Sequence, residues 1–488
     1  MAQQPGLGHK TFPRPFKDYV PFMTFRRLLV LSLAPLLMLG GCETIESLGD
    51  HTATTLGLGD DAPKAYTASE VNQAQRGGIA VADEPLAART GAGVLTSGGG
   101  AVDAVAAMFF TLTATYPVAA GLGAGGICLV RDATGQVTEF DFLTKAPRAG
   151  GLYALPGAVK GFAEMHRLYG ALPWQRVVAP GEAFASTGFP VSQALAVRLV
   201  AAQNIVRLDA PLAAEFLDET GAPRLAGTEA RNVPLGVVLG AIRQGGADGF
   251  YKGEAAARIV AYSAAQGGGI SAGELAGTAV LQGPARSRSV GALVAYLPGA
   301  RTGAGAFSAS MMDNLSRRGA RNAGASVQTA AAQSLAAFGV AALPRDLGST
   351  GFAAVDINGG AASCAVTLNG PFGSGHTAAG TGVALGMTPS SQTGLASAFL
   401  TPVIAQSGGQ VAMAGAGAGG PAGTAAAVGA VLAAAGGRSL GKRGDLAGTG
   451  TAPYDTVNMI SCDETSCVAL SDPGAHGAGA AAEVVATQ

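Results

Sequence analysis

Short apolar runs alternate with glycine-rich turns along most of the chain, and this pattern predicts a layered protein. Residues 77–83 have the composition of a buried strand, and residues 84–98 follow a helical spacing. Residues 101–115 are apolar almost throughout, which predicts a helix buried on all sides. Two apolar runs at 127–132 and 136–142, separated by a Thr-Gly turn, predict a hairpin.

The pattern becomes helical and then returns to strands further along the chain. Helical periodicity continues with breaks from residue 156 to about residue 345. Strand hairpins are predicted within 351–370 and within 399–417, and the second of these leads to an Ala-rich helix at 423–437. This order of strands, helices and strands predicts an α+β protein with sheets sandwiched between helices.

Composition narrows the possible partners. The 488 residues are 48% hydrophobic and 13% charged, with a formal net charge of −1, so we expect no nucleic acid partner. The glycine-rich stretch at 121–126 contains no lysine and precedes a predicted strand, which argues against phosphate binding. Neither Cys128 nor Cys364 has a histidine or a second cysteine nearby at metal spacing, and we expect neither a metal nor a cofactor.

The N-terminal residues 1–41 have the features of a signal peptide. A positive segment from Met23 precedes twelve apolar residues at 28–39, too few to span a bilayer. Met23 alone would start a normal signal, so the residues before it are interpreted as a mis-assigned start. Small residues lead to Cys42, and this arrangement resembles a bacterial lipobox, which implies cleavage before Cys42 and lipidation of its thiol. The alternative is an ordinary secretory signal with an incidental cysteine.

A lipid on Cys42 would hold the protein at the cell envelope. Residues 42–76 are polar and small, and we interpret them as a tether that lifts the folded part off the membrane. Glu43 after the cysteine favours the outer membrane in lipoproteins of this type. The predicted location is therefore the bacterial envelope, with a lipid anchor and the folded part facing the periplasm.

The other four cysteines are assigned by their surroundings. Cys128 and Cys364 lie within apolar strand patterns, and we interpret both as buried packing residues. Cys462 and Cys467 lie near a turn, where an exported compartment permits a disulfide. Two free thiols at that turn are the alternative.

Four blocks of sequence together resemble the γ-glutamyltransferases, also called γ-glutamyltranspeptidases or glutathione hydrolases. They follow the order found in that family and cover roughly residues 76–437. The resemblance implies the four-layer αββα sandwich of N-terminal-nucleophile hydrolases, which agrees with the layered α+β pattern. The blocks are SGGGAVDAVAAMFFTLTATYPVAAGLGAGGICLV, PGAVKGFAEMHRLYGALPWQRVVAPGEAFASTGFPVS, GGADGFYKGEAAARIVAYSAAQGGGISAGELAG and STGFAAVDINGGAASCAVTLNGPFGSGHTAAGTGVALG.

In that family a precursor cleaves itself, and the freed N-terminal residue becomes the nucleophile. The resemblance places the cleavage between Gly348 and Ser349. It implies a large-subunit-like part at 77–348 and a small-subunit-like part at 349–472. Residues 473–488 are of low complexity, and we expect them to form a disordered tail.

The resemblance also implies the site residues. Ser349 stands at the nucleophile, Thr350 at the hydroxyl residue that follows it, and Thr367 at a threonine that contacts the nucleophile. Thr350 is the alternative nucleophile, and an ordinary Gly-Ser-Thr-Gly turn is the alternative to any site here. Gly419 and Gly420 match the loop whose backbone amides form an oxyanion hole, a feature that stabilises developing negative charge.

Three positions concern the glutamyl group of the substrate. Asn369 matches an asparagine that helps to hold the α-amino group, and Ser391 stands where the family has an acidic residue for that amine. Leu143 stands where the family has the arginine that binds the α-carboxylate. Lys145 and Arg148 lie close by in sequence and could replace that arginine, although a lysine cannot form a bidentate clamp.

Two functions follow from these matches and departures. The first is a self-processing amide hydrolase or acyltransferase that acts on γ-glutamyl or related amides or peptides. The second is an inactive lipoprotein that keeps the fold as a binding or scaffold module. Three further residues are predicted to have structural and not catalytic roles: His376 in a loop, Asp103 at the start of the buried helix, and His166 at a surface or interface.

Overall fold

The computed structural model describes residues 73–75, 77–318, 323–337, 339–340, 342–389, 394–442 and 444–482. The predicted signal peptide, Cys42 and most of the tether lie outside these residues, as does Ser391. Within the described ranges, no helix combines the length and the apolar character needed to cross a bilayer.

Two seven-stranded sheets dominate the described part of the chain. All strand pairs between neighbours in these sheets are antiparallel. The first sheet has the order β1 (Gln73–Gln75), β17 (Ser466–Ser471), β16 (Thr456–Cys462), β15 (Gln410–Ala418), β14 (Thr401–Ser407), β9 (Leu293–Leu297) and β8 (Arg286–Val290). The second has the order β18 (Ala478–Ala481), β2 (Ile79–Ala82), β10 (Ser349–Val355), β11 (Ala361–Thr367), β3 (Gly125–Arg131), β4 (Val137–Asp141) and β7 (Leu281–Pro284).

Helices and two short strand pairs complete the described elements. The short pairs are β5 (Phe189–Pro190) with β6 (Glu229–Ala230), and β12 (Thr377–Ala378) with β13 (Val383–Ala384). The helices are α2 (Pro85–Thr96), α3 (Ala101–Thr115), α4 (Ala158–Tyr169), α5 (Trp174–Thr187), α6 (Gln193–Leu208), α7 (Ala210–Phe216), α8 (Val233–Gly245), α9 (Asp248–Tyr251), α10 (Gly253–Ala265), α11 (Ala272–Ala276), α12 (Gly303–Arg318), α13 (Ala323–Ala337), α14 (Leu395–Ala398) and α15 (Pro421–Ala435).

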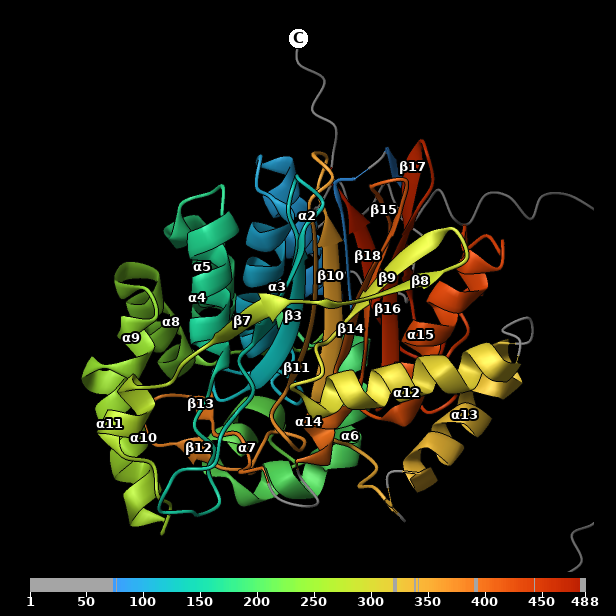
Figure 1. The fold of residues 1–488 in the computed structure, drawn as a ribbon. Helices are drawn as coiled ribbons and strands as arrows, with labels where there is room; N and C mark the ends of the chain where they lie inside the picture. The colour runs from blue at the N-terminus through green and yellow to red at the C-terminus, as the bar shows by residue number, and fades with distance from the viewer. Residues whose placement is uncertain are drawn as a thin grey trace, which may run out of the picture. The chain divides into compact units, whose positions relative to one another are not determined.

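The two sheets pack face to face between two layers of helices. Strand β10 of one sheet contacts β15 of the other, α3 packs on β10 and β11, and α15 packs on β14, β15 and β16. Figure 1 shows α2 to α5 on one side of the sheets and α12, α13 and α15 on the other. The predicted α+β, four-layer αββα sandwich is therefore confirmed.

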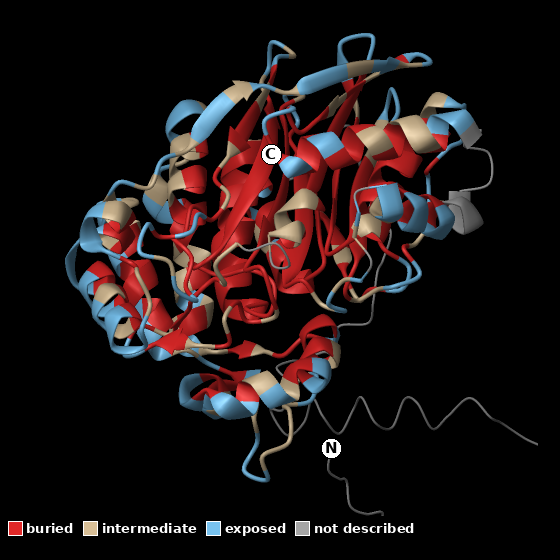
Figure 2. Cartoon of the chain, turned by 60° about the horizontal axis from the view of Figure 1, so that its bottom comes forward, coloured by how far each residue is buried: buried red, intermediate tan, exposed pale blue. Residues whose placement is uncertain are grey.

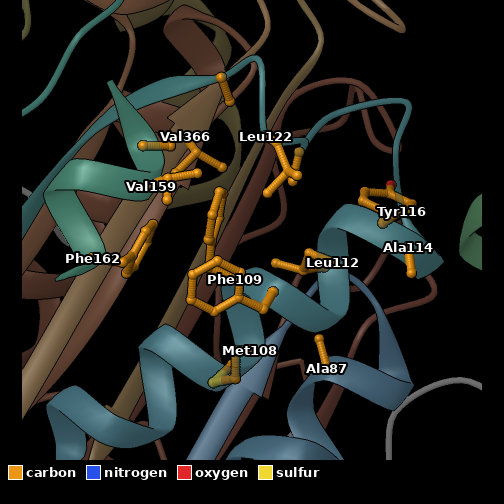
Figure 3. Packing of buried hydrophobic residues seen from close by; sticks show 14 of the residues in the cluster. Ala87, Met108, Phe109, Leu112, Ala114, Tyr116, Leu122, Val159, Phe162 and Val366 are labelled. Atoms are coloured by element: carbon orange, nitrogen blue, oxygen red, sulfur yellow. The ribbon is translucent and has the colours of Figure 1, made fainter. Parts of the chain in front are cut away.

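Helix α3 fills one of the helical layers because almost every side chain on it is apolar. All fifteen of its residues are buried, as the sequence predicted. Phe109 stacks on Phe162 of α4 with ring centroids 4.3 Å apart, and Figure 3 shows Met108 and Leu112 close to this pair. Figure 2 shows the buried residues concentrated in the sheets and in the helix faces that cover them.

Strand β10 connects two of the cores through its alternating side chains. Phe352 and Ala354 belong to the core that includes α3, whereas Ala353 and Val355 belong to the core between the sheets. This alternation is the expected geometry of a strand covered on both faces. It fixes the direction of the residues at the start of the strand, where the candidate site begins.

Three parts of the sequence prediction are wrong about secondary structure. Residues predicted to be helical include the strands β7, β8 and β9. The side chains of β7 and β8 are exposed or half-buried and carry little apolar signal, whereas β9 is apolar and mostly buried but is only five residues long. Strand β1 lies inside the predicted tether and pairs with β17. Strand β18 lies inside the predicted disordered tail and pairs with β2, and its Gly479 leaves room for the Ala469 side chain of β17.

The cysteines form two disulfides across paired strands. Cys128 and Cys364 are register partners on β3 and β11 and are bonded to each other. They are buried, as predicted, but the interpretation as unbonded packing residues was wrong. Cys462 and Cys467 are bonded across β16 and β17, so the disulfide is the correct one of the two alternatives.

Candidate functional site

Ser349 opens β10 and faces Thr367, its register partner at the end of β11. The Ser349 hydroxyl donates to Thr367 Oγ1 at 2.9 Å, and the Leu347 carbonyl oxygen is also within reach at 3.3 Å. Thr367 Oγ1 accepts from the Asn369 backbone N–H at 2.9 Å. The two hydroxyl groups predicted to contact one another therefore do so. Ser349 is only 1% exposed, so the uncleaved chain covers it.

The Gly348–Ser349 peptide is held in a conformation that requires glycine. Gly348 has φ +61°, and a Cβ atom there would lie 1.8 Å from the Gly370 carbonyl oxygen. The Gly348 carbonyl oxygen accepts from the Leu368 N–H at 2.9 Å, and Thr367 Oγ1 lies 3.3 Å away. Two donors therefore surround the carbonyl oxygen that precedes Ser349.

A buried arginine contacts both sides of this peptide. Arg198 of α6 is fully buried and forms an ion pair with Asp346 through both carboxylate oxygens. Its Nη1 atom lies 3.4 Å from the carbonyl oxygen of Ser349 and 3.4 Å from the Tyr116 hydroxyl. Asp346 in turn accepts from the Gly348 N–H at 2.8 Å. The pair therefore links the residues before and after the predicted cleavage point.

The Thr350 hydroxyl has different hydrogen-bond partners from the Ser349 hydroxyl. Its hydroxyl donates to Asp83 at 2.7 Å, and the same carboxylate accepts from Thr456 at 2.9 Å and Asn458 at 2.8 Å. Burial raises the pKa of Asp83, and these hydrogen bonds offset only part of that rise. Thr350 therefore belongs to a buried polar network centred on Asp83.

Asn369 follows Thr367 and lies against the loop after β4. It has φ +62°, an uncommon backbone conformation for a residue other than glycine. Its Nδ2 atom donates to Thr144 Oγ1 and to the Met387 carbonyl oxygen, both at 2.9 Å. Its Oδ1 atom is buried and has no hydrogen-bond partner. The amide therefore presents a free acceptor beside Thr144.

The Gly419–Gly420 turn joins β15 to α15. Gly419 has φ +91°, and a Cβ atom there would lie 1.9 Å from the Tyr454 carbonyl oxygen. Ala416, near the end of β15, packs on Gly351, near the start of β10, so the turn lies at the end of the sandwich where β10 begins. Burial raises the pKa of Asp455 beside this turn to about 7.

Leu143 is packed as an apolar residue. It joins a small cluster with four buried side chains from both sheets and from the residue before β14: Ala365, Leu400, Ala416 and Ala418. Lys145 and Arg148 instead line a separate cavity of about 530 Å³ together with Glu274. The Glu274 carboxylate accepts from the Arg148 N–H at 2.8 Å, so that cavity carries both signs of charge.

The other chemically notable residues have structural contacts. The His376 ring lies 2.8 Å from the Tyr153 hydroxyl. Asp103 accepts from the Gly100 N–H at 2.9 Å and caps α3, as the sequence predicted. His166 Nε2 lies 2.8 Å from the Leu172 carbonyl oxygen. No group of three or more potential metal ligands occurs in the ranges that the structure describes.

Sequence reasoning missed Arg198, Asp346 and the Asp83 network. A single arginine among apolar residues in "ALAVRLVAA" signals a buried charge that needs a partner. Asp346 is three residues before Ser349, but no local sequence pattern predicts its pairing with Arg198, which is 148 positions away.

Comparison with known proteins agrees with the fold and with part of the sequence. Residues 87–280 match the family described as gamma-glutamyltranspeptidase. A glutathione hydrolase proenzyme from Pseudomonas sp. (strain A14) is 29% identical over 231 residues, covering 43% of this chain and 40% of that protein. The Escherichia coli (strain K12) glutathione hydrolase proenzyme is 31% identical over 225 residues, covering 42% of this chain and 39% of that protein.

The matched segments span two fifths or less of these relatives. Human glutathione hydrolase 7 is 35% identical over 191 residues, covering 36% of this chain and 28% of that protein. The family match ends at residue 280, before the segment that contains Ser349.

Solved structures extend the likeness over most of the fold. A cephalosporin acylase from Bacillus halodurans has a TM-score of 0.66 at 18% identity, covering 87% of this chain and 99% of that protein. A structure titled LmbA2991T421A has a TM-score of 0.64 at 15% identity, covering 85% of this chain and all of that protein. At such identities the likeness concerns the fold alone. The sequence similarity to the γ-glutamyltranspeptidase family therefore covers residues 87–280, and the likeness in fold covers most of the described chain.

Proposed function

We propose that the chain is a self-processing amide hydrolase or acyltransferase of the γ-glutamyltranspeptidase type. Cleavage between Gly348 and Ser349 would make Ser349 an N-terminal nucleophile. Similarity to that family supports the reaction class, and two of the relatives above are described as proenzymes. The substrate class is a small amide or peptide.

The observation that carries the proposal is the arrangement around the Gly348–Ser349 peptide. The Ser349 hydroxyl lies within hydrogen-bond distance of Thr367, and the Gly348 carbonyl oxygen already accepts a backbone N–H from Leu368. Donors that surround a carbonyl oxygen stabilise the negative charge that develops on it during nucleophilic attack. An ordinary turn needs no buried serine, no left-handed Gly348 and no pair of donors at this point.

Processing follows from these contacts. The Ser349 oxygen attacks the Gly348 carbonyl carbon, and the C–N bond breaks as an ester forms and the nitrogen takes up the hydroxyl proton. Water then hydrolyses the ester to give a Gly348 carboxylate and a free Ser349 α-amine. The Arg198–Asp346 pair holds the chain on both sides of this bond while it reacts.

The processed chain would transfer acyl groups with the same serine. An α-amine has a pKa of roughly 7.7 to 8.0, so a useful fraction is neutral near pH 7 and can accept the Ser349 hydroxyl proton. Thr367 orients the hydroxyl, and the N–H groups of Gly419 and Gly420 stabilise the oxyanion. Asn369 accepts a hydrogen bond from an amine on the substrate, and Ser391 remains a second candidate contact for that amine.

The proposed location is the bacterial envelope, with a lipid on Cys42 as the membrane anchor. Its support is the apolar run before Cys42, together with two disulfides, since disulfides persist in oxidising compartments. Labelling with a radioactive fatty acid tests it. Label in the wild type and none in Cys42→Ser is expected, and equal labelling of the two would contradict it.

A denaturing gel of the purified, folded protein tests the proposed function; it is run after reduction, because the Cys128–Cys364 disulfide joins the two parts. We expect two fragments that meet at residues 348 and 349, a single chain for Ser349→Ala, and two fragments for the control Thr350→Val. The cleaved protein should also release p-nitroaniline from an acyl anilide. A folded wild type that stays intact and releases none would support the scaffold function instead.

A further inference from the structure

The family resemblance assigns the substrate carboxylate to position 143, which is connected to the proposed nucleophile Ser349 through a short chain of contacts. Ser349 pairs with Thr367, and Thr367 is the register partner of Gly125 on β3. A Cβ atom on Gly125 would lie 2.2 Å from the Thr144 nitrogen and 2.7 Å from the Leu143 carbonyl carbon. The Leu143–Thr144 backbone therefore fits against Gly125 because that residue has no side chain.

The Leu143 side chain makes this position apolar. It is half-buried against Ala365, Leu400, Ala416 and Ala418, and none of these groups can donate a hydrogen bond to a carboxylate. Placing an ionised carboxylate on such a surface without a partner is costly, because the lost hydration is not replaced. A substrate with a carboxylate here would bind poorly.

The neighbouring cations do not restore the missing partner. Lys145 and Arg148 line the cavity that also contains Glu274, and the Glu274 carboxylate would repel a substrate carboxylate placed there. The Lys145 backbone pairs with Leu155, and its side chain is exposed.

Asn369, which the resemblance assigns to the substrate amine, has an unpaired acceptor. Asn369 Oδ1 is buried without a partner, 3% of the residue is exposed, and its Nδ2 atom is already used by Thr144 and Met387. A buried acceptor without a donor costs free energy, and a substrate N–H group would remove that cost. The site therefore has an acceptor for an amine and an apolar surface where a carboxylate partner would be needed.

We infer that the preferred acyl donor carries an amine but no α-carboxylate, so that it resembles a 4-aminobutanoyl amide and not a γ-glutamyl amide. Leu143 is the residue that sets this preference. The inference rests on the proposed function, since it assumes that Ser349 accepts the acyl group.

Four p-nitroanilides test the inference. They differ only in whether the acyl group carries the amine, the carboxylate, both or neither. The 4-aminobutanoyl anilide carries the amine, the glutaryl anilide the carboxylate, the γ-glutamyl anilide both, and the butanoyl anilide neither. We expect kcat/KM of the wild type to be at least about tenfold higher for 4-aminobutanoyl than for γ-glutamyl, a difference of about 1.4 kcal/mol. The glutaryl anilide should be the poorest donor. Spontaneous release without enzyme is subtracted.

Leu143→Arg should reverse this preference. The guanidinium would pair with the carboxylate, so kcat/KM should rise for the γ-glutamyl and glutaryl anilides and fall for 4-aminobutanoyl. Leu143→Met is the matched control, because it keeps the apolar surface and should keep the ranking of the wild type.

The results of these experiments distinguish the donor inference from the proposed self-processing. A chain that cleaves but prefers the γ-glutamyl anilide, or that turns over none of the four, overturns the donor inference and leaves self-processing intact. A folded chain that does not cleave, or a Ser349→Ala variant as active as the wild type, overturns the proposed function and the inference with it.

Discussion

The peptide before Ser349 and the surface around Leu143 lie close together but differ in the groups that they offer. Around the peptide, buried polar groups are paired: Ser349 with Thr367, and Arg198 with Asp346. Around Leu143, four of five side chains in the cluster are buried and all are apolar. The first region has the contacts on which the proposed bond cleavage depends, and the second lacks the charge that a glutamyl substrate would require.

This difference implies that self-processing and donor specificity depend on different residues. The peptide that is cleaved belongs to the chain itself, so its positioning needs no substrate pocket. Donor binding needs the groups on the loop after β4 and beside Asn369. Variants should therefore affect one property without the other, and the predictions below are ordered from the largest expected effect to the smallest.

The largest effect is expected from Ser349→Ala. The variant removes the attacking oxygen, so cleavage should stop completely while the fold remains, because a serine-to-alanine change leaves almost no cavity. A denaturing gel measures it, and circular dichroism checks the fold. Ser349→Thr keeps a hydroxyl and should still cleave; equal cleavage of the Ala variant and the wild type would exclude Ser349 as the nucleophile.

The second-largest effect is expected from Arg198→Met. The change leaves Asp346 buried without its partner, which should destabilise the uncleaved chain by about 3–5 kcal/mol. It also releases the residues on both sides of the bond, so cleavage should slow at least about tenfold, which is about 1.4 kcal/mol of barrier. Urea unfolding in the Ser349→Ala background measures the stability, and timed gels measure cleavage.

A double variant distinguishes positioning from stability. Arg198→Met with Asp346→Asn removes both charges, so most of the lost stability should return while cleavage stays slow. If cleavage recovers together with stability, Arg198 acts only through the fold.

The pH dependence of stability should change modestly in Asp455→Asn. Burial raises the pKa of Asp455 to about 7 from its ordinary value of 3.8, so the folded chain keeps a proton that the unfolded chain releases. This contribution is complete below about pH 4 and is lost as the pH rises through about 7. The unfolding free energy lost between pH 5 and pH 8 should shrink by about 2–3 kcal/mol in the variant.

Urea unfolding of the Ser349→Ala chain at the two pH values measures this difference. The single chain has the same covalent connectivity in both variants, so the two unfolding curves can be compared directly. An unchanged slope in the Asn variant would mean that Asp455 is already ionised in the folded chain at pH 5.

The smallest effect is expected from Lys145→Ala. Lys145 is exposed and lines the cavity that also contains Glu274. Its removal should change kcat/KM for the γ-glutamyl anilide less than about twofold, which is well under 1 kcal/mol. A tenfold loss would show that Lys145 replaces the missing arginine, and the contrast between the two regions would no longer hold.

Local patterns in the sequence predicted much of the fold. Helix α3 has the predicted bounds because its apolar run begins after three glycines and needs no distant partner to be recognised. The hairpin of β3 and β4 was predicted for the same reason. Strands β8 and β7 were missed because their side chains are mostly exposed, so they lack the apolar period of a buried strand.

Long-range pairing explains what the sequence could not predict. Cys128 and Cys364 are 236 residues apart, and only the register of β3 with β11 brings them together. Arg198 and Asp346 are 148 residues apart and meet through the packing of α6 on the site. The positions of Ser349 and Thr367 came from family resemblance, and their contact depends on a register that no local pattern contains.

The mass of the intact polypeptides in a folded preparation, measured after reduction, tests the central claim most directly. Self-processing predicts a fragment whose N-terminal sequence is Ser-Thr-Gly-Phe, starting at Ser349, and a second fragment that ends at Gly348. Both fragments should be absent from Ser349→Ala. A folded, disulfide-bonded wild type with a single unbroken chain, or a cut at any other peptide bond, would contradict the account.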